Sequence, residues 1–360
     1  MKICFLWGSM GIGGAERVIS SLSNTFVQND DEVCILVSDS NPSKYILDKK
    51  VKYITLGMSG ENTTLVQTAK SAIKKISLIK AKMRQLDPDI IIAFHVKLAI
   101  LAKVACPNRV VIGSERSNPY KTRISNREKL IVQLSSFLNG FVFQTKGARN
   151  FYPRTVQKKS AVIPNAISIS VPADLQKYQE RSKQIVFVGR LEKEKRVDLL
   201  LRAFEAISSK HSEYHLLIYG EGREKEYLVE LAKKKALANK VFFMGFTDDV
   251  ATVLSKSRIF VLSSDEEGMP NTLIEAMACG CACVSTDCNF GPSELINNGV
   301  NGMLVETGND VQIANALDKI LSDERFGEYL SNNAKLISKE LSMDAVAQKY
   351  KTYFTSLIKD

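Results

Sequence analysis

The sequence has few of the side chains that build metal sites and disulfide frameworks. It contains three histidines and no Cys-x-x-Cys pair, so a Cys/His metal site is not expected. Its seven cysteines are an odd number, and Cys279, Cys281 and Cys283 stand on alternate positions. This alternation is typical of a helix end that continues into a strand rather than of a disulfide framework. The cysteines therefore indicate reduced thiols in a cytoplasmic protein.

Long apolar runs are also missing. No run of about 18 apolar residues occurs, so no membrane-spanning helix is expected. Lys2 is followed by a short apolar run that turns directly into glycine-rich sequence, which does not have the pattern of a signal peptide. The chain shows no nucleic-acid-binding module and no interleaved basic and aromatic platform, so nucleic acid is not an expected partner.

The bulk composition is that of an ordinary globular protein, with 45% hydrophobic and 24% charged residues. A length of 360 residues favours two domains. Residues 1–165 carry 25 Lys/Arg and 11 Asp/Glu, a balance of +14, whereas residues 166–360 carry 24 and 28, a balance of −4. This asymmetry predicts that the first half faces an anionic partner such as a membrane, although the same excess could simply keep a domain soluble.

Short apolar runs alternate with helical stretches along the whole chain. In the first half we expect strands at residues 3–7, 32–37, 51–56, 89–94, 110–114 and 140–144. In the second half we expect them at residues 184–189, 215–219, 241–245, 259–263, 282–285 and 302–305. Such alternation predicts an α/β fold whose parallel sheets carry helices on both faces. Residues 160–166 are expected to leave the first domain, and the polar stretch 174–183 to form a linker or surface loop.

Residues 263–287 read SSDEEGMPNTLIEAMACGCACVSTD and contain two carboxylates, Glu267 and Glu275. Pro270 suits the first turn of a helix, which we expect to run to about Cys279 and to close at Gly280. The free N–H groups and the dipole of such a helix start favour an anion such as a phosphate. This stretch therefore predicts a polar-ligand site, although both glutamates could also be ordinary solvated surface charges.

Glycines follow several of the expected strands. In the second half they are Gly189, Gly220, Gly245 and Gly268, so the loops at the carboxyl ends of the strands should line one crevice, where ligands of open α/β sheets bind. The first strand is followed by a glycine-rich loop at residues 8–14 that lacks the spacing of the dinucleotide fingerprint. Glycines there let a ligand approach the backbone closely, although the tight turn alone could explain them.

Residues 66–86 have apolar residues at helical spacing, which predicts a helix that packs on the core. Its other positions carry six cations and no acid: Lys70, Lys74, Lys75, Lys80, Lys82 and Arg84. They form either a solvated basic face or a surface attracted to anionic lipid. A second basic group, near Tyr120, supports the lipid interpretation: Lys121, Arg123, Arg127 and Lys129.

Five motifs in this order and spacing are together highly specific. They are GGAER (13–17), IPNAI (163–167), VGRLEKEKR (188–196), YGEG (219–222) and EGMPNTLIEAMACG (267–280). Through them nearly the whole chain resembles glycosyltransferase family 4, the "group 1" retaining glycosyltransferases of GT-B fold. The resemblance implies two Rossmann-like domains that face each other across a cleft. Residues 1–165 would form the acceptor-binding domain and 166–342 the nucleotide-sugar-binding domain, with a last helix at 343–360 crossing back to the first.

The resemblance also assigns roles to single residues. It implies that Arg190 and Lys195 hold the donor diphosphate, that Glu267 contacts the transferred sugar and that Glu275 binds the ribose. His95 falls where many relatives carry a histidine that faces the donor sugar, although a lone histidine after a strand is often structural. The implied donor-binding residues are Gly13, Gly14, Gly189, Gly220, Gly222, Phe246, Gly268, Met269, Pro270, Asn271, Thr272 and Glu275.

Two positions depart from the family pattern. Arg196 stands where a glycine is common, and Ala166 replaces the glycine of IPNG. Both substitutions could alter the geometry of the loops near the phosphates.

The function expected from the resemblance is retaining transfer of a hexose or N-acetylhexosamine from a nucleotide-sugar, a UDP-sugar in particular. The GMPN segment favours galactose or N-acetylgalactosamine. The expected acceptor is a lipid-linked or growing surface glycan such as O-antigen or capsule, and no cofactor or metal is expected. The protein would lie at the inner face of the cell membrane. Two alternatives stay open: a UDP-sugar epimerase of GT-B-like fold, and a non-catalytic nucleotide-sugar-binding protein.

Overall fold

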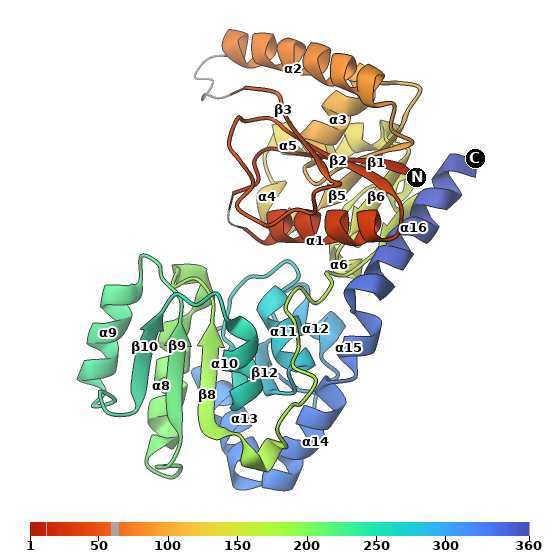
Figure 1. The fold of residues 1–360 in the computed structure, drawn as a ribbon. Helices are drawn as coiled ribbons and strands as arrows, with labels where there is room; N and C mark the ends of the chain where they lie inside the picture. The colour runs from red at the N-terminus through yellow and green to blue at the C-terminus, as the bar shows by residue number, and fades with distance from the viewer. Residues whose placement is uncertain (12, 59–64, 360) are drawn as a thin grey trace. The chain divides into compact units, whose positions relative to one another are not determined.

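The computed structural model describes residues 1–11, 13–58 and 65–359 (Figure 1). Its contacts divide the chain into two compact units. The first unit comprises Met1–Ala166 and Met343–Asp360, and the second comprises Ile167–Ser342. The division falls one residue beyond the boundary expected from the sequence, and the last helix belongs to the first unit, as expected.

The first unit is built on a seven-stranded parallel sheet of order β3-β2-β1-β4-β5-β6-β7. Its strands are β1 (Lys2–Trp7), β2 (Glu32–Val37), β3 (Lys52–Thr55), β4 (Ile90–Ala93), β5 (Val110–Glu115), β6 (Gly140–Phe143) and β7 (Ser160–Val162). Strand β7 lies in the segment that was expected to leave the domain, and it pairs with β6 instead. It is three residues long and only partly buried, so its sequence carries little strand signal.

Helices cover both faces of this sheet. They are α1 (Gly14–Gln28), α2 (Leu65–Leu86), α3 (Val96–Ala105), α4 (Pro119–Thr122), α5 (Asn126–Leu134), η1 (Ser135–Phe137), α6 (Lys146–Phe151), α7 (Arg154–Gln157) and α16 (Met343–Lys359). Side chains alternate between the faces of a strand, and Cys4 and Leu6 of β1 pack in one core with α2 and α3. Phe5 points the other way and stacks on Phe26 of α1, which in turn contacts Phe354 of α16.

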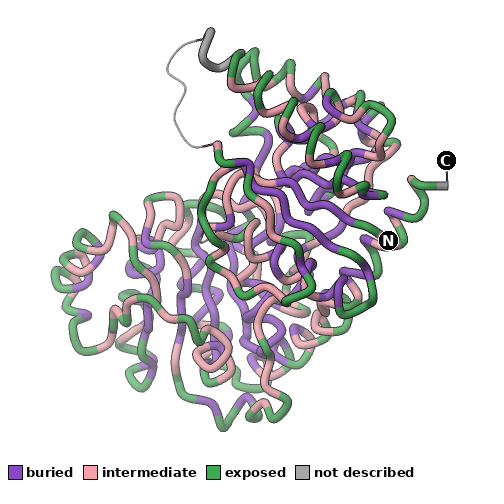
Figure 2. The backbone as a smooth tube through the Cα atoms, turned by 45° about the horizontal axis from the view of Figure 1, so that its top comes forward, coloured by how far each residue is buried: buried purple, intermediate pink, exposed green. Residues whose placement is uncertain are grey.

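The second unit repeats this plan with a six-stranded parallel sheet of order β10-β9-β8-β11-β12-β13. Its strands are β8 (Ser182–Val188), β9 (His215–Tyr219), β10 (Val241–Gly245), β11 (Ser257–Leu262), β12 (Ala282–Thr286) and β13 (Met303–Val305). Its helices are η2 (Tyr178–Glu180), η3 (Lys193–Lys195), α8 (Val197–Ser208), α9 (Lys225–Lys234), α10 (Val250–Lys256), α11 (Asn271–Ala278), α12 (Pro292–Leu295), α13 (Asp310–Ser322), α14 (Glu324–Ala334) and α15 (Ile337–Glu340). The central strands form the buried middle of each unit (Figure 2), whereas outer strands such as β3 and β10 are partly exposed.

The strand orders indicate where a ligand would be expected to bind. In each sheet the order reverses between two adjacent central strands, β1 and β4 in the first unit and β8 and β11 in the second. Ligands of open α/β sheets bind outside the carboxyl ends of the strands at this switch point. The predicted α/β architecture of two parallel sheets is therefore confirmed. The loops after these four strands are the expected place for a ligand.

One part of the expected linker is folded into the core. The polar stretch 174–183 was expected to be a linker or surface loop, but it contains η2, whose Tyr178 is buried. A Cβ on Gly327 would come within 2.5 Å of the Tyr178 hydroxyl, so α14 packs closely on this ring. Tyr178 fixes the segment because an aromatic side chain buries a large apolar area.

Candidate active site

The loop after β11 and the helix α11 that follows it carry the two glutamates predicted as site residues, Glu267 in the loop and Glu275 in the helix. Strand β11 ends at Leu262 and α11 begins at Asn271, with Pro270 as its N-cap. The predicted helix is confirmed, except that Pro270 precedes its first turn rather than lying within it. Gly280 has φ +74°, the left-handed conformation that was expected to close the helix. The start of α11 therefore lies at the carboxyl edge of the sheet, next to the switch point.

Lys195 and Glu267 form an ion pair between the loops after β8 and β11. The Lys195 Nζ lies 2.6 Å from Glu267 Oε1, and both side chains are largely shielded from solvent. Ser264 donates a second hydrogen bond of 2.7 Å to the same carboxylate oxygen. The structure thus brings together two residues that the sequence assigned to the diphosphate and to the transferred sugar.

Glu275 lies inside the second unit. Its residue is 2% exposed, and its Oε1 accepts a hydrogen bond of 2.9 Å from the Ser168 hydroxyl. A buried carboxylate needs hydrogen-bond donors to remain charged. Ser168 was not predicted as a site residue, because no local pattern indicates that the chain after IPNAI returns to α11.

Arg190 differs from Lys195 in its surroundings. Its side chain is 72% exposed, and it makes an ion pair of 3.3 Å with Glu194. An exposed pair of this kind contributes little to stability, so the guanidinium is available to a ligand at small cost. Of the two cations predicted to bind the diphosphate, Lys195 is therefore shielded from solvent and Arg190 is exposed.

Arg196 has a left-handed backbone, with φ +48° and ψ +40°. This is the conformation that favours glycine, and a glycine is common at this position in the resembled family. The conformation costs a non-glycine residue roughly 1–2 kcal/mol. Arg196 pairs with Asp198 at 3.0 Å and with Asp265 at 3.0 Å, and these contacts offset part of that cost. The loop therefore keeps the glycine-type geometry without a glycine.

The glycines of the YGEG motif have a packing reason. A Cβ on Gly220 would lie 1.8 Å from the Gly189 carbonyl oxygen, and one on Gly222 would lie 2.2 Å from that of Leu191. Gly220 also has φ +139°. These glycines allow the loops after β8 and β9 to approach each other closely. Gly189, Gly220 and Gly222 therefore shape the segment that carries Arg190.

The GMPN segment packs against a glycine that sequence reasoning missed. Gly291 has φ +89°, and a Cβ there would lie 2.5 Å from the Gly268 carbonyl oxygen and 2.7 Å from Pro270 Cδ. Met269 is buried, whereas Asn271 and Thr272 at the start of α11 are partly exposed. Phe246 lies separately after β10 and is 72% exposed. The signal for Gly291 was the pair Gly291–Pro292, which is typical of a tight turn.

The first unit gathers its predicted residues at the carboxyl ends of β1 and β4. His95 is the N-cap of α3, and its ring centroid lies 6.4 Å from that of Trp7. Burial and the nearby Arg123 and Lys97 charges hold the pKa of His95 below its ordinary value of 6.5. The imidazole is therefore neutral near pH 7 and can both donate and accept a hydrogen bond.

Gly13 and Gly14 begin helix α1 beside the same edge. The Tyr45 hydroxyl accepts a hydrogen bond from the Gly13 N–H and donates one to its carbonyl. A Cβ on Gly13 would lie 2.3 Å from Glu16 Oε2. The other carboxylate oxygen of Glu16, Oε1, accepts a hydrogen bond from the Trp7 indole N–H. A Cβ on Gly13 would require the Glu16 side chain to move, and Gly14 is exposed.

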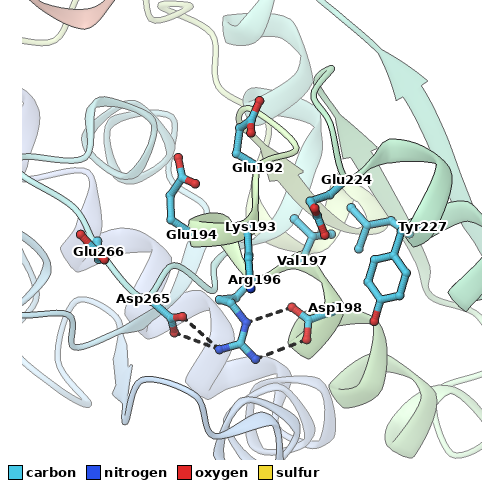
Figure 3. Close-up of a pocket in the computed structure, with 11 residues that line it drawn as sticks. Glu192, Lys193, Glu194, Arg196, Val197, Asp198, Glu224, Tyr227, Asp265 and Glu266 are labelled. Carbon is cyan, nitrogen blue, oxygen red and sulfur yellow. Dashed lines mark hydrogen bonds and ion pairs between the residues drawn. The ribbon is translucent and has the colours of Figure 1, made fainter.

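A pocket of about 580 Å³ is lined in part by residues that adjoin Lys195 and Glu267 in the chain (Figure 3). It is lined by Glu192, Lys193, Glu194, Arg196, Val197, Asp198, Glu224, Tyr227, Leu228, Asp265 and Glu266. Arg190, Lys195, Glu267 and His95 are not among these lining residues. Six of its lining residues are acids and two are cations, and this excess of negative charge would repel a diphosphate. The pocket therefore adjoins the proposed donor-phosphate position without containing it.

The two basic groups of the first unit have different environments. On α2, Lys70, Lys74, Lys80 and Arg84 are exposed, and Lys75 and Lys82 are partly exposed. In the second group, Arg123 was expected to add to a lipid-attracting surface, but it is buried and pairs with Glu115 at 2.9 Å. Its charge is neutralised inside the protein, so it does not belong to the basic surface. In the described part of the chain, no helix has the length and apolar character needed to cross a membrane.

Comparison with known proteins relates most of the second unit to a family model. Residues 173–337 match the family model described as glycosyl transferases group 1. A relative from Campylobacter jejuni, an alpha-1,4-N-acetyl-D-galactosaminyltransferase named for a GalNAc- and diNAcBac-containing diphospho-undecaprenol substrate, is 27% identical over 97% of each chain. A second N-acetylgalactosaminyltransferase of that organism, also named for a diphospho-undecaprenol substrate, is 27% identical over 94% of this chain and 95% of its own.

Solved structures establish the fold. The Anabaena protein HepE, in complex with UDP, superposes with a TM-score of 0.81 at 20% identity over 99% of this chain and all of its own. The lipopolysaccharide outer core galactosyltransferase WaaB superposes with a TM-score of 0.79 at 21% identity over 99% of each chain. Together these findings support the glycosyl transferases group 1 as the family of this chain, and they show that it is a glycosyltransferase with two Rossmann-like domains.

Proposed function

We propose that the protein transfers an N-acetylhexosamine or hexose from a UDP-sugar to a lipid-linked glycan, with retention of the anomeric configuration. The Lys195–Glu267 pair at 2.6 Å, beside the start of α11, is the observation that carries this proposal. The names of the Campylobacter relatives support a diphospho-undecaprenol-linked acceptor and N-acetylgalactosamine as the sugar. The UDP complex of HepE supports UDP as the nucleotide.

The donor diphosphate would bind between the loop after β8 and the start of α11. Lys195 and Arg190 supply positive charge for the leaving diphosphate, and the free N–H groups of the helix start supply hydrogen bonds. Lys195 has three N–H donors, so it can keep Glu267 and add a phosphate oxygen. Glu275 would accept hydrogen bonds from the ribose hydroxyls.

The transfer step exchanges one bond of the anomeric carbon for another. The bond to the β-phosphate oxygen breaks, and the acceptor hydroxyl oxygen attacks from the same face of the sugar. A nonbridging oxygen of the departing diphosphate takes the hydroxyl proton, so no separate base is required. Glu267 orients the sugar hydroxyls. No metal or other cofactor has a role in this scheme.

We further propose that the first unit binds the acceptor and lies on the inner face of an anionic membrane. The exposed cations of α2 attract anionic lipid, each contributing about 1 kcal/mol close to the surface. Ile73 on the same helix is 68% exposed and provides an apolar contact.

Vesicle sedimentation tests this surface. We expect the protein to sediment with phosphatidylglycerol-containing vesicles at low salt and not with pure phosphatidylcholine. Replacing Lys70, Lys74 and Lys80 by Glu should abolish sedimentation, whereas the same replacement at Lys183, Lys234 and Lys256 of the second unit should not. Equal sedimentation of the two triple variants would contradict the assignment to α2.

The activity itself is tested by incubating the protein with a panel of UDP-sugars, with and without an undecaprenyl-diphosphate-linked glycan. We expect release of UDP that depends on the acceptor, and a product heavier by one sugar residue in mass spectrometry. Interconversion of UDP-sugars without UDP release would identify the epimerase alternative. Tight UDP binding without turnover of any sugar would identify the non-catalytic alternative.

A further inference from the structure

We infer that Arg196 is a positioning residue for the donor site. Through its ion pair with Asp265, Arg196 holds the segment that contains Lys195 against the loop that contains Glu267. This inference rests on the proposed roles of Lys195 and Glu267 and deepens them. Arg196 itself does not contact that pair. Arg196 would act by fixing the distance between the two loops that carry Lys195 and Glu267.

The geometry places the two ion pairs side by side. Arg196 directly follows Lys195, and Asp265 precedes Glu267 by two residues. The Arg196 Nη1 lies 3.0 Å and 3.2 Å from the two Asp265 carboxylate oxygens. Figure 3 shows the guanidinium between Asp265 and Asp198, with both carboxylates directed at it. The same two loops are thus joined twice, by Lys195–Glu267 and by Arg196–Asp265.

Backbone contacts reinforce this junction. The Asp265 N–H donates to the Glu194 carbonyl at 2.9 Å, and the Ser263 hydroxyl donates to the Lys195 carbonyl at 2.8 Å. They hold the main chain at Glu194 and Lys195. The Arg196–Asp265 pair adds a contact at the residue that follows Lys195. The chain is therefore held both before and after the lysine side chain.

The left-handed conformation of Arg196 gives the neighbouring side chains separate directions. Lys195 contacts Glu267, whereas Arg196 lines the acidic pocket together with Asp265. A glycine would allow the same backbone but would provide no ion pair. The arginine therefore adds a side-chain bridge at a position where backbone geometry alone would favour a glycine.

The two partners of Arg196 provide a matched control. Asp265 lies in the Glu267 loop, whereas Asp198 lies in the first turn of α8 and is also 3.9 Å from Arg202. If the bridge acts through Glu267 and Lys195, only the loss of Asp265 should impair turnover. If Arg196 merely stabilises the fold, the loss of either aspartate should have a similar effect.

The experiment measures UDP release from UDP-N-acetylgalactosamine, with water or the lipid-linked glycan as acceptor, for Asp265→Asn, Asp198→Asn, Arg196→Gly and Lys195→Ala. We expect Asp265→Asn and Arg196→Gly to lower kcat roughly ten- to a hundredfold, because small displacements of catalytic groups have effects of this size. The kcat of Asp198→Asn should stay within about twofold of the parent value. The kcat of a further variant, Arg196→Lys, should lie between those of the parent and Arg196→Gly. Thermal melting verifies folding, and Asp265→Asn carries the test if Arg196→Gly does not fold.

A double mutant separates positioning from a structural role. In the Lys195→Ala protein, Asp265→Asn should lower kcat no further, because the bridge acts through Lys195. Additive effects of the two substitutions would contradict the positioning role of Arg196. So would parent-like turnover of Asp265→Asn if Lys195→Ala is slow. Either result would leave the proposed function unchanged. Parent-like turnover of Lys195→Ala, or no turnover by the parent, would overturn the proposed function and the bridge with it.

Discussion

Lys195 and Glu267 are 72 positions apart in the chain, yet their charged atoms lie 2.6 Å apart. The family motifs made it possible to predict both residues from the sequence. Three residues that contact the site were not predicted: Ser264, which bonds Glu267, Asp265, which pairs with Arg196, and Ser168, which bonds Glu275. Their roles depend on how the loops meet in three dimensions. The departure at Arg196 was identified in the sequence, but its left-handed backbone and its two ion pairs were not.

Replacing Glu275 by Gln tests its assignment to the ribose. Gln is nearly isosteric and can still accept the Ser168 hydrogen bond, but it removes the charge. Hydrogen bonds to charged groups contribute about 1.5–3 kcal/mol, so we expect the Kd for UDP to rise roughly ten- to a hundredfold in calorimetric titration. Inorganic pyrophosphate, which has no ribose, should bind both proteins equally. An unchanged Kd for UDP would contradict the assignment.

His95 should make stability depend on pH in the mildly acidic range. Burial, Arg123 and Lys97 lower its pKa in the native state below 6.5, so the unfolded chain takes up a proton first as the pH falls. The free energy of unfolding should therefore be highest above pH 6.5 and decrease below it, down to the native pKa. Urea unfolding at pH 7.5 and 5.5 should show a smaller loss for His95→Gln than for the parent. Equal losses would show that the native pKa is not lowered.

At the scale of elements, the strand–loop–helix units were the most predictable part. Strands β2, β9 and β10 have the predicted bounds, and most others differ by one or two residues, because apolar runs between glycines and polar turns define buried parallel strands. Strand β7 and the η2 turn were missed. Both are short, and tertiary packing rather than local sequence determines them.

The end of α11 offers a test of helix closure. Gly280 and Gly299 have nearly the same φ, +74° and +76°, but a Cβ on Gly280 would lie 2.9 Å from Lys335 Cδ and 3.0 Å from an Arg181 nitrogen, whereas Gly299 faces open space. Gly299→Ala should cost only the left-handed strain of roughly 1–2 kcal/mol. Gly280→Ala should cost more, because the Arg181 guanidinium is buried and bonded to the Gly280 carbonyl. Equal free energies of unfolding for the two variants would contradict this packing argument.

At the scale of the whole molecule, two parallel sheets of matching strand order each carry a set of polar residues at the switch point. The second unit holds Lys195, Glu267 and Glu275, and the first holds His95 and Trp7. The charge asymmetry of the sequence belongs to this division, since residues 1–165 carry the excess of +14. Length and alternation were sufficient to predict this plan, whereas the identity of the acceptor depends on surface detail that no motif encodes.

The most direct test of the central claim is a calorimetric titration of UDP into the protein in the presence of EDTA. We predict binding that does not require a divalent metal, and a Kd at least about tenfold higher for Lys195→Ala, because a charge-assisted phosphate contact is lost. Binding that disappears in EDTA, or an equal Kd for the parent and Lys195→Ala, would contradict the claim that protein cations at the carboxyl edge of the second sheet hold the donor.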